Sequence, residues 1–441
     1  MKNKNKKFFF ATSKIKEYWS KEHPIIFSGD WCFDYKDDLI KSRANIIPYQ
    51  WNNSKKVINA QIYCDKIFEE VLKKISKDLN KRLKLNHQSK YYRILIGNWL
   101  THYIHQCYDK YTCIMKAKKA NEIFTFYINE EEDNIPYDFE EFIDLSLKPE
   151  YQTRLFSELF AEMNLERRKI PRIIRKKTDI RKSKNLFFNA IRKLISYVKN
   201  NFFYFIFILF SNFYTPTIIV SNPYFKQRSL KNKIYLFIRS KGRMFFFNPI
   251  IKNKYVHSDT IYDFRNSKKE IPSTFNNIAY NLVKRNIPRV YLEYHQDYTK
   301  YVNKFYNINN NISWLTFQWS GNTVFQYIAA LKYSKSIILL AQHGSGYGMD
   351  KIHSLEKNER AVSKEYFTYG WKESKKTIPL SQPDLDIGKT IDRNKNTILF
   401  VSTTRPIHLV RFHNGSNSSQ NLIDNVDFPI TFLKNCKYNQ H

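Results

Sequence analysis

The stretch SIILLAQHGSGYG, residues 336–348, decides the fold class. Residues 336–341 form a continuous apolar run, which is typical of a parallel strand buried on both faces. The run leads directly into Gln342 and His343, and three glycines follow within five residues. Because open α/β sheets bind ligands at the carboxyl ends of their strands, the stretch predicts an α/β protein with a site in this loop.

The glycines make this loop sterically open, so its backbone N–H groups can approach a phosphate or a sugar hydroxyl. Their spacing fits neither GxxxxGK[ST] nor GxGxxG, so the loop is neither a P-loop nor a standard dinucleotide site. His343 stands at the predicted strand end, where a general base or a phosphate-binding donor is useful. A structural turn histidine is the alternative interpretation.

A second apolar run, PIIFS at residues 24–28, ends at Gly29-Asp30-Trp31-Cys32. Asp30 is a candidate acid–base residue for a sugar hydroxyl, or else a cap of the next helix. Cys32 has no basic neighbour in sequence and is read as structural.

PRVYLE at residues 288–293 is expected to be a strand with Glu293 at its end, although a surface role for Glu293 fits as well. We expect residues 25–28 and 337–341 to share one parallel sheet. Asp30, Glu293 and His343 are then expected to meet in one cleft.

Apolar periodicity predicts the remaining elements and the domain organisation. The predicted helices are 13–21, 57–84, 92–111, 151–164, 274–284 and 322–330; the predicted strands are 8–12, 123–128, 217–221, 233–237, 313–316 and 365–369. Residues 167–183 are dense in Lys and Arg and are expected to be an exposed helix or a mobile connection. We expect a Rossmann-like lobe over residues 1–375, a linker over 376–396 and the start of a second lobe over 397–441.

The composition allows a large buried core, with 42% hydrophobic and 26% charged residues in 441. The formal net charge of +33 fits a phosphorylated donor, nucleic acid or an anionic membrane surface. Compositional drift is the alternative, because Lys is scattered along the whole chain. No nucleic-acid-binding motif is present, so no nucleic-acid partner is expected.

Cysteine and hydropathy patterns point to a cytoplasmic protein. Five cysteines without a CxxC pair suggest neither a zinc site nor a disulfide framework. The apolar run at 202–210 is too short to span a bilayer, which takes about 20 residues. The basic segment before it, residues 167–199, keeps a peripheral membrane contact open.

Aromatic residues offer candidate sugar-binding faces at Tyr49, Trp51 and Trp99, although core packing is the better interpretation of Trp99 taken alone. His102 and His105 stand at i and i+3, so they can share one helix face. A metal pair would need further ligands, and none is evident in the sequence. No metal and no cofactor is therefore predicted.

Several segments together resemble a family of bacterial transferases encoded among surface-polysaccharide genes. The matching segments are 29–32 (GEWC-like), 48–51 (PYHW-like), 97–105 (GPWL..IH-like), 292–293 (LE), 342–348 (QHGGGYG-like) and 366–371 (FLTWGW-like). This chain departs from the pattern at Asp30, Gln50 and Ser345, which replace Glu, His and Gly. The matches run in order from residue 8 to about residue 405.

The resemblance implies a GT-B-like glycosyltransferase fold with two Rossmann-like lobes, an acceptor side and a donor side. It implies a nucleotide-activated sugar donor and a carbohydrate or lipid-linked acceptor as partners. His343, Asp30 and Glu293 are the candidate catalytic residues. The candidate substrate-binding residues are Trp31, Tyr49, Trp51, Trp99, His102, Gln342, Gly344, Gly346 and Tyr347.

Family members are usually longer than this chain, so we expect a truncated donor lobe and possible inactivity. The alternatives are transfer of a phosphoalditol or glycerophosphate on the same scaffold, or a non-catalytic basic protein that binds nucleic acid or an anionic membrane.

Overall fold

The computed structural model describes most of the first 380 residues and one short later segment. The described residues are 7–34, 36–128, 135–170, 206, 218–221, 230–246, 262–267, 270–305, 313–316, 319, 321–334, 337–344, 346–380 and 408–412. The predictions for 202–210 (apart from Ile206), for 171–183 and for Ser345 lie outside these residues. So does most of the region beyond residue 380.

Eleven described strands form two sheets in which every strand pair is parallel. The first sheet has the order β3-β2-β1-β4-β5, with β1 (Lys7–Ala11), β2 (Ile25–Phe27), β3 (Asn45–Ile46), β4 (Glu122–Ile128) and β5 (Glu166–Ile170). The second has the order β11-β10-β9-β8-β6-β7, with β6 (Ile218–Ser221), β7 (Met244–Phe246), β8 (Ser313–Thr316), β9 (Ile337–Ala341), β10 (Glu365–Tyr369) and β11 (Thr377–Leu380). The predicted α/β class with parallel, Rossmann-like sheets is confirmed.

The prediction of one shared sheet is wrong, because β2 lies in the first sheet and β9 in the second. Both runs are apolar for the same reason, burial between helix layers, and apolar character does not say which sheet a strand joins. A second parallel sheet therefore stands before residue 381. Its edge strand β11 uses four residues of the predicted linker.

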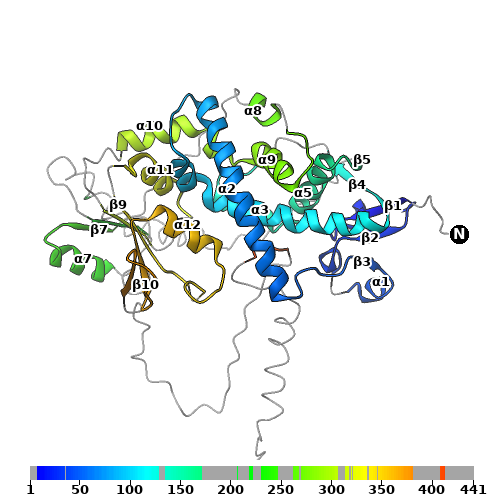
Figure 1. Ribbon diagram of the computed structural model, residues 1–441, viewed down its shortest axis with the longest axis horizontal. Coiled ribbons are helices and arrows are strands. Elements are labelled where there is room, and N and C mark those ends of the chain that lie inside the picture. Colours follow the sequence, from blue (N-terminus) through cyan, green and yellow to red (C-terminus); the bar gives the residue numbers. More distant parts are fainter. Residues whose placement is uncertain are drawn as a thin grey trace, which may run out of the picture.

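Two long helices separate the sheets, α2 (Ser54–Leu83) and α3 (Ser89–Ala120). In Figure 1 they cross the middle of the molecule, with β1 and β2 on one side and β9 and β10 on the other. Asn53 caps α2 by accepting the backbone N–H of Lys55 at 2.8 Å. Helix α3 packs against α2, α5, α9, α11 and α12 and is buried around most of its circumference.

Shorter helices cover the remaining faces. They are α1 (Asp38–Lys41), α4 (Phe139–Ser146), α5 (Pro149–Glu162), α7 (Leu230–Arg239), α8 (Tyr262–Asn266), α9 (Phe275–Asn286), α10 (His295–Phe305), α11 (Thr323–Lys332) and α12 (Ser354–Val362), with the 3-10 turns η1 (Lys16–Tyr18), η2 (Asp30–Cys32) and η4 (Arg289–Tyr291). One hydrophobic cluster runs from the first sheet through α2 and α3 to the second sheet.

Four predicted elements differ from the structure. Residues 167–170, expected to begin an exposed helix or a mobile connection, lie in strand β5 and pair with β4. Residues 233–237 belong to helix α7 rather than to a strand, because the apolar run IYLF is equally compatible with an amphipathic helix. Residues 288–293 form the turn η4, since Arg289 and Val290 donate their N–H groups to the carbonyls of Pro136 and Tyr137. The predicted helix at 13–21 reduces to η1.

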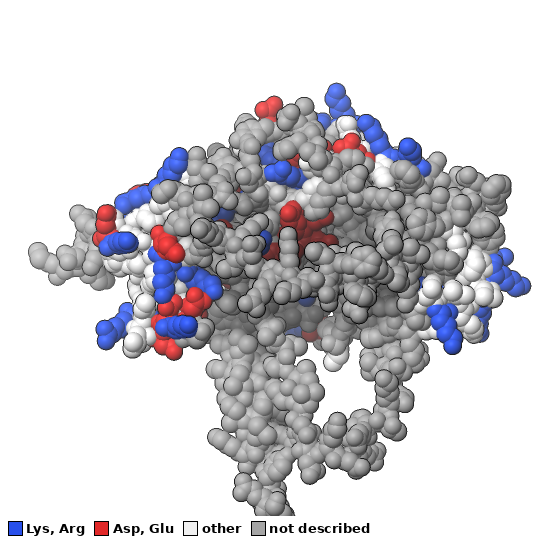
Figure 2. Space-filling model, turned by 180° about the vertical axis from the view of Figure 1, so that it is seen from behind, with Lys and Arg blue, Asp and Glu red and all other residues white. Residues whose placement is uncertain are grey.

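Among the residues that the structure describes, Lys and Arg do not gather in one patch on the face that Figure 2 shows. Lys and Arg side chains are spread over both ends of that face, with acidic side chains among them and near its middle. The distribution fits scattered lysines better than one continuous anion-binding surface.

Candidate functional site

The loop that follows β9 is held in place by the side chain of Gln342. Its Nε2 donates to the carbonyl of Gly344 at 2.8 Å. Its Oε1 accepts the backbone N–H of Tyr369 at 2.9 Å and the indole N–H of Trp371 at 2.8 Å. One buried amide therefore joins the loops at the carboxyl ends of β9 and β10.

Gly348 is the position in this loop where glycine is required. Its φ of +72° favours glycine, and an added Cβ would lie 2.4 Å from the Trp371 ring. Its N–H donates to the carboxylate of Glu356 at 2.9 Å. At Gly344, by contrast, an added Cβ would meet only ordinary contacts with Tyr347. The carbonyl of Gly346 accepts the N–H of Asp350 at 2.9 Å and closes the turn.

His343 stands at the end of β9 in contact with a buried carboxylate. Its Nε2 lies 3.1 Å from Oε1 of Glu359 and 2.7 Å from the hydroxyl of Tyr347. The Tyr347 hydroxyl is also 3.2 Å from Glu359 Oε1, and Tyr366 donates to Oε2 at 3.0 Å. The imidazole side chain is 19% exposed, whereas the Glu359 side chain is 4% exposed.

A consistent proton arrangement follows from these contacts. The hydroxyls of Tyr347 and Tyr366 donate to Glu359, and Nε2–H of His343 donates into the same group, so Nδ1 carries the lone pair. Burial raises the pKa of Tyr347 and of Tyr366 well above the usual range, so both hydroxyls keep their protons. A base oriented by a buried carboxylate is the arrangement used in general acid–base catalysis.

Helix α12 brings Glu359 to this position. His353 caps the helix, because its Nδ1 accepts the backbone N–H of Glu356 at 3.1 Å. On the opposite side of α12, Asn358 donates to the hydroxyl of Thr101 on α3 at 2.7 Å. Residue 359 therefore lies between the loop after β9 and the central helix.

Residues 408–412, here called the strap, lie across α3. The guanidinium of Arg411 contacts Nε2 of His102 at 3.5 Å, and the backbone N–H of Phe412 donates to Nδ1 of His105 at 3.2 Å. His102 in turn makes a 2.8 Å contact between its Nδ1 and the carbonyl of Asn98. Both imidazoles therefore act as acceptors toward the strap. Burial lowers the pKa of each to about 3, so both are neutral at physiological pH.

The strap also reaches the first sheet. The His408 ring lies 5.6 Å from the Trp31 ring, and the Phe412 ring lies 4.8 Å from the Trp51 ring, both between centroids. The charge of Arg411 acts on Tyr347 and Glu359 in the loop network. The strap thus contacts the carboxyl end of β2, and its Arg411 lies close enough to the loop after β9 for the charges there to act on it.

Below the strap, α3 carries further buried polar groups. Trp51 donates its indole N–H to Asp109 at 2.5 Å, and Gln50 donates to the Asp109 carbonyl at 2.9 Å. Lys110 Nζ lies 3.8 Å from the Asp109 carboxylate, and both side chains are buried. Burial raises the pKa of Asp109 and lowers that of Lys110.

Six of the predicted site residues therefore lie along this network or next to it, and two more contact the strap ring to ring. Those in the network are His343, Gln342, Gly344, Gly346, Tyr347 and His102; those in ring contact with the strap are Trp31, tilted against His408, and Trp51, edge-on to Phe412.

Asp30 lies near this group but faces away from it. Its side chain is 68% exposed, and it pairs with Lys41 at 3.1 Å. The neighbouring Trp31 is half-buried and donates its indole N–H to Ser28 at 2.9 Å.

Glu293 has a different environment, because Arg265 binds both of its carboxylate oxygens at 2.8 Å. Arg265 also donates to the carbonyls of Arg285 and Ile287, so the pair fastens α8 to the end of α9. The strand that was expected to present Glu293 is absent, since this segment is η4. The convergence of Glu293 with Asp30 and His343 stays a prediction.

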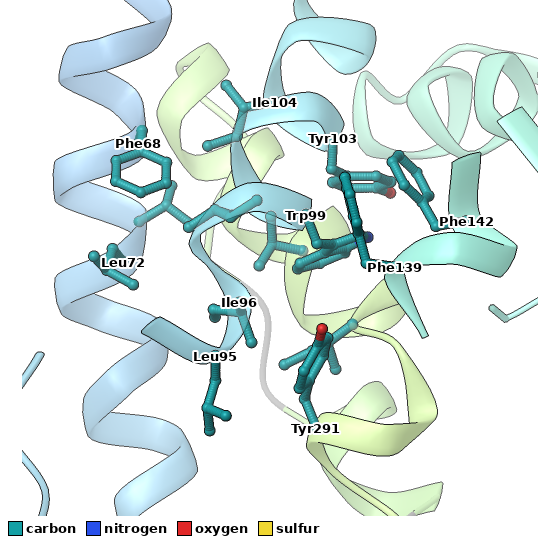
Figure 3. Packing of buried hydrophobic residues seen from close by; sticks show 14 of the residues in the cluster. Phe68, Leu72, Leu95, Ile96, Trp99, Tyr103, Ile104, Phe139, Phe142 and Tyr291 are labelled. Carbon is teal, nitrogen blue, oxygen red and sulfur yellow. The ribbon is translucent and has the colours of Figure 1, made fainter. Parts of the chain in front are cut away.

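Trp99 is a core residue in the structure. It is 1% exposed, stacks on Tyr103 at 5.1 Å and meets Phe142 edge-on at 6.4 Å. Figure 3 shows these three rings between α3 and α4. Tyr49 is partly buried and packs against the same core.

Within the described ranges, no group of three or more His, Cys, Asp or Glu side chains lies together as a metal site would require. Nor does any described helix have the length and apolar character needed to cross a bilayer. The possible peripheral membrane contact stays a prediction. Cys32, read as structural, is buried, and burial raises its pKa to about 11.

Fold and site define a parallel α/β protein with two sheets and a polar site at the ends of their strands. The chain belongs to the LIC12162 family of transferases, whose family model matches residues 8–439. The resemblance seen in the sequence is thus confirmed at the level of a transferase family. No curated protein and no solved structure shows significant similarity to the chain.

Sequence reasoning missed Glu359, Tyr366 and Arg411. A signal existed for Glu359, because a capping residue at His353 and acidic residues in the next turn are typical of a helix start. Tyr366 was visible as part of a predicted strand and of the FLTWGW-like segment, but without a role. Arg411 carried no local signal, since its role depends on contact with α3, some 300 residues away in sequence.

Proposed function

We propose that this protein transfers a sugar from a nucleotide-activated donor to a carbohydrate or lipid-linked acceptor in bacterial surface-polysaccharide assembly. The carrying observation is His343 at the end of β9, oriented by the buried Glu359 and by Tyr347. Family membership supports transfer as the reaction class. The sequence resemblance to polysaccharide-associated transferases supports the sugar and the GT-B arrangement.

In the proposed reaction, Nδ1 of His343 removes the proton from an acceptor hydroxyl. The acceptor oxygen forms a bond to the anomeric carbon, and the bond from that carbon to the donor phosphate oxygen breaks. The nucleoside diphosphate leaves with the electron pair, and the proton stays on the imidazole until solvent removes it. Glu359 stabilises the imidazolium as it forms, so it is a positioning residue.

The second parallel sheet supports activity in this chain. The expectation of inactivity rested on a single sheet before residue 397, whereas β6 to β11 form a second one before residue 381. The strap contacts Trp31 after β2 and His102 on α3, and the charge of Arg411 acts on Tyr347 and Glu359 near the end of β9. In a GT-B arrangement, donor and acceptor bind between two such lobes.

The test is transfer and donor hydrolysis by the purified full chain across a panel of nucleotide-activated sugars. A nucleotide-activated alditol belongs in the panel, because it separates sugar transfer from phosphoalditol transfer. We expect turnover of a sugar donor that falls about 10²- to 10⁴-fold in His343→Ala. Glu359→Gln should lower kcat with little change in KM, because it acts through the imidazole.

His23→Ala is the matched control, because His23 lies just before β2, at the amino end of that strand and not at its carboxyl end. It should keep wild-type turnover. Turnover that survives unchanged in His343→Ala would contradict the proposed role of this histidine. Consumption of the alditol donor alone would favour phosphoalditol transfer.

A further inference from the structure

Arg411 has no ionic partner within the part of the chain that the structure describes. Among the described residues, none of the carboxylates forms an ion pair with it, and its one hydrogen-bond contact is the long one to neutral His102. Glu359 is close enough for its charge to act on Arg411, but Tyr347, Tyr366 and His343 already surround that carboxylate. A guanidinium in a partly buried setting is costly to keep unpaired, because it has lost water without gaining an anion.

Unused hydrogen-bonding groups lie on the same part of α3. The side-chain amides of Asn98 and Gln106 are 2% and 0% exposed, and neither finds a hydrogen-bond partner within the part of the chain that the structure describes. They stand one turn before and one turn after His102, the residue that Arg411 contacts. Buried amides normally have partners, so unpaired ones mark a place where a polar molecule is expected.

A second cation lies nearby. The buried Lys110 stands one turn beyond Gln106, and burial together with the charge of Lys110 lowers the pKa of His408 on the strap. Asp109 is near Lys110, but its carboxylate also accepts from Trp51. The segment of α3 under the strap therefore holds positive charge and spare amide groups together.

We propose that Arg411, with the amides of Asn98 and Gln106, binds the diphosphate of the transferred group's carrier. This assignment rests on the proposed function for the identity of the ligand, but not for the presence of an anion site. A guanidinium offers planar, paired N–H donors that match phosphate oxygens. At this position it would stabilise the charge that develops on the leaving diphosphate while His343 removes the acceptor proton.

The test measures binding, not turnover. Calorimetric titration measures the affinity of the full chain for inorganic pyrophosphate, and thermal unfolding is recorded with and without this ligand. Both measurements are made on the wild type, on Arg411→Gln and on the control Arg239→Gln. Arg239 is exposed on α7, so its variant removes the same charge outside the site. We expect saturable binding that weakens at least about tenfold in Arg411→Gln and is unchanged in Arg239→Gln.

Thermal unfolding separates a binding role from a structural one. Without pyrophosphate, Arg411→Gln should unfold at or above the wild-type temperature, because an unpaired charge has been removed while glutamine can still donate to His102. With saturating pyrophosphate, the wild type should gain at least about 2 °C and Arg411→Gln nothing. A strongly lowered unfolding temperature in Arg411→Gln, together with unchanged pyrophosphate affinity, would overturn the proposal.

Two further ligands identify the carrier. A nucleoside diphosphate that competes with pyrophosphate indicates a donor site, whereas competition by geranyl diphosphate alone indicates a lipid diphosphate. No binding of any diphosphate by the wild type at low salt would overturn the anion site. Binding at Arg411 without any sugar transfer would overturn only the proposed function, so the two failures are distinguishable.

Discussion

The turn after β2 and the loop after β9 occupy equivalent places, each at the carboxyl end of a parallel strand, but they use their polar residues differently. At β9, the imidazole of His343 meets the buried Glu359. At β2, the carboxylate of Asp30 is largely in solvent and pairs with a surface lysine. Both places contain a glycine against which an indole ring packs, Gly348 with Trp371 and Gly29 with Trp31.

The difference shows that strand-end position alone does not make a catalytic residue. Burial of Glu359 removes water from its contact with His343, which strengthens that contact and fixes the orientation of the ring. Asp30 does not have a buried partner of this kind in its ion pair, because Lys41 is itself partly exposed and water screens the contact. The proposed chemistry therefore belongs to the β9 side, whereas Trp31 on the β2 side packs against the strap.

The largest expected effect is a difference in transfer rate between variants at the carboxyl end of β9 and at that of β2. His343→Ala should lower sugar transfer about 10²- to 10⁴-fold, whereas Asp30→Asn should change it less than about threefold. Steady-state transfer rates of both purified variants check this. A comparable loss in Asp30→Asn would show that the β2 end also supplies an acid–base group.

The next effect concerns the two glycines. Gly348→Ala should lower the free energy of unfolding by about 2–4 kcal/mol, because it combines a positive φ with a clash against Trp371. Gly29→Ala should cost about 1 kcal/mol, because Gly29 has an extended backbone and the half-buried Trp31 ring can move.

Urea unfolding of both glycine variants measures the difference. Equal losses of unfolding free energy would mean that the β2 turn is as rigid as the β9 loop.

A third effect depends on pH and concerns His408, the strap residue whose ring contacts Trp31. Burial lowers the pKa of His408 to about 3, below its unfolded value of about 6.5. The unfolded state therefore binds the proton first as pH falls below about 6.5, and stability is lost toward lower pH. Between pH 7 and pH 5 this histidine should account for up to about 2 kcal/mol of lost stability.

His408→Gln should remove that share of the pH dependence while leaving the remainder. Urea unfolding at pH 7, 6 and 5 for both proteins gives the comparison. Parallel pH curves for the wild type and the variant would contradict a buried, neutral His408.

The smallest effect is expected at the surface pair of the β2 turn. Asp30→Asn should change the free energy of unfolding by less than about 1 kcal/mol, because exposed ion pairs contribute little and salt screens them. Added salt should abolish even this difference. A loss well above 1 kcal/mol would show that Asp30 has a buried partner as well.

Local pattern predicted much of the fold. The strand at β9 and the helices α2 and α3 follow from apolar runs and helical spacing, which depend on neighbours in sequence. The segment at 288–293 was misread, because the carbonyls of Pro136 and Tyr137 that hold it lie some 150 residues away. The division into two sheets was missed for the same reason.

The site residues also divide into those that local sequence predicts and those that depend on distant contacts. His343 and the glycines were visible as a strand end with an open loop. Glu359 reads as one more charge on a surface helix until α12 is packed between β9 and α3. Arg411 and its contact with His102 join distant parts of the chain, and no spacing rule reports such a contact.

The strap also sets an order of events during synthesis. At about 5–20 residues per second, the ribosome needs tens of seconds to proceed from Trp31 to Phe412. From the synthesis of His105 until that of Phe412, the strap is absent, so its contacts with His102 and His105 cannot form. Assembly of the site therefore waits for residues 408–412, and a nascent chain that ends before residue 408 lacks the strap.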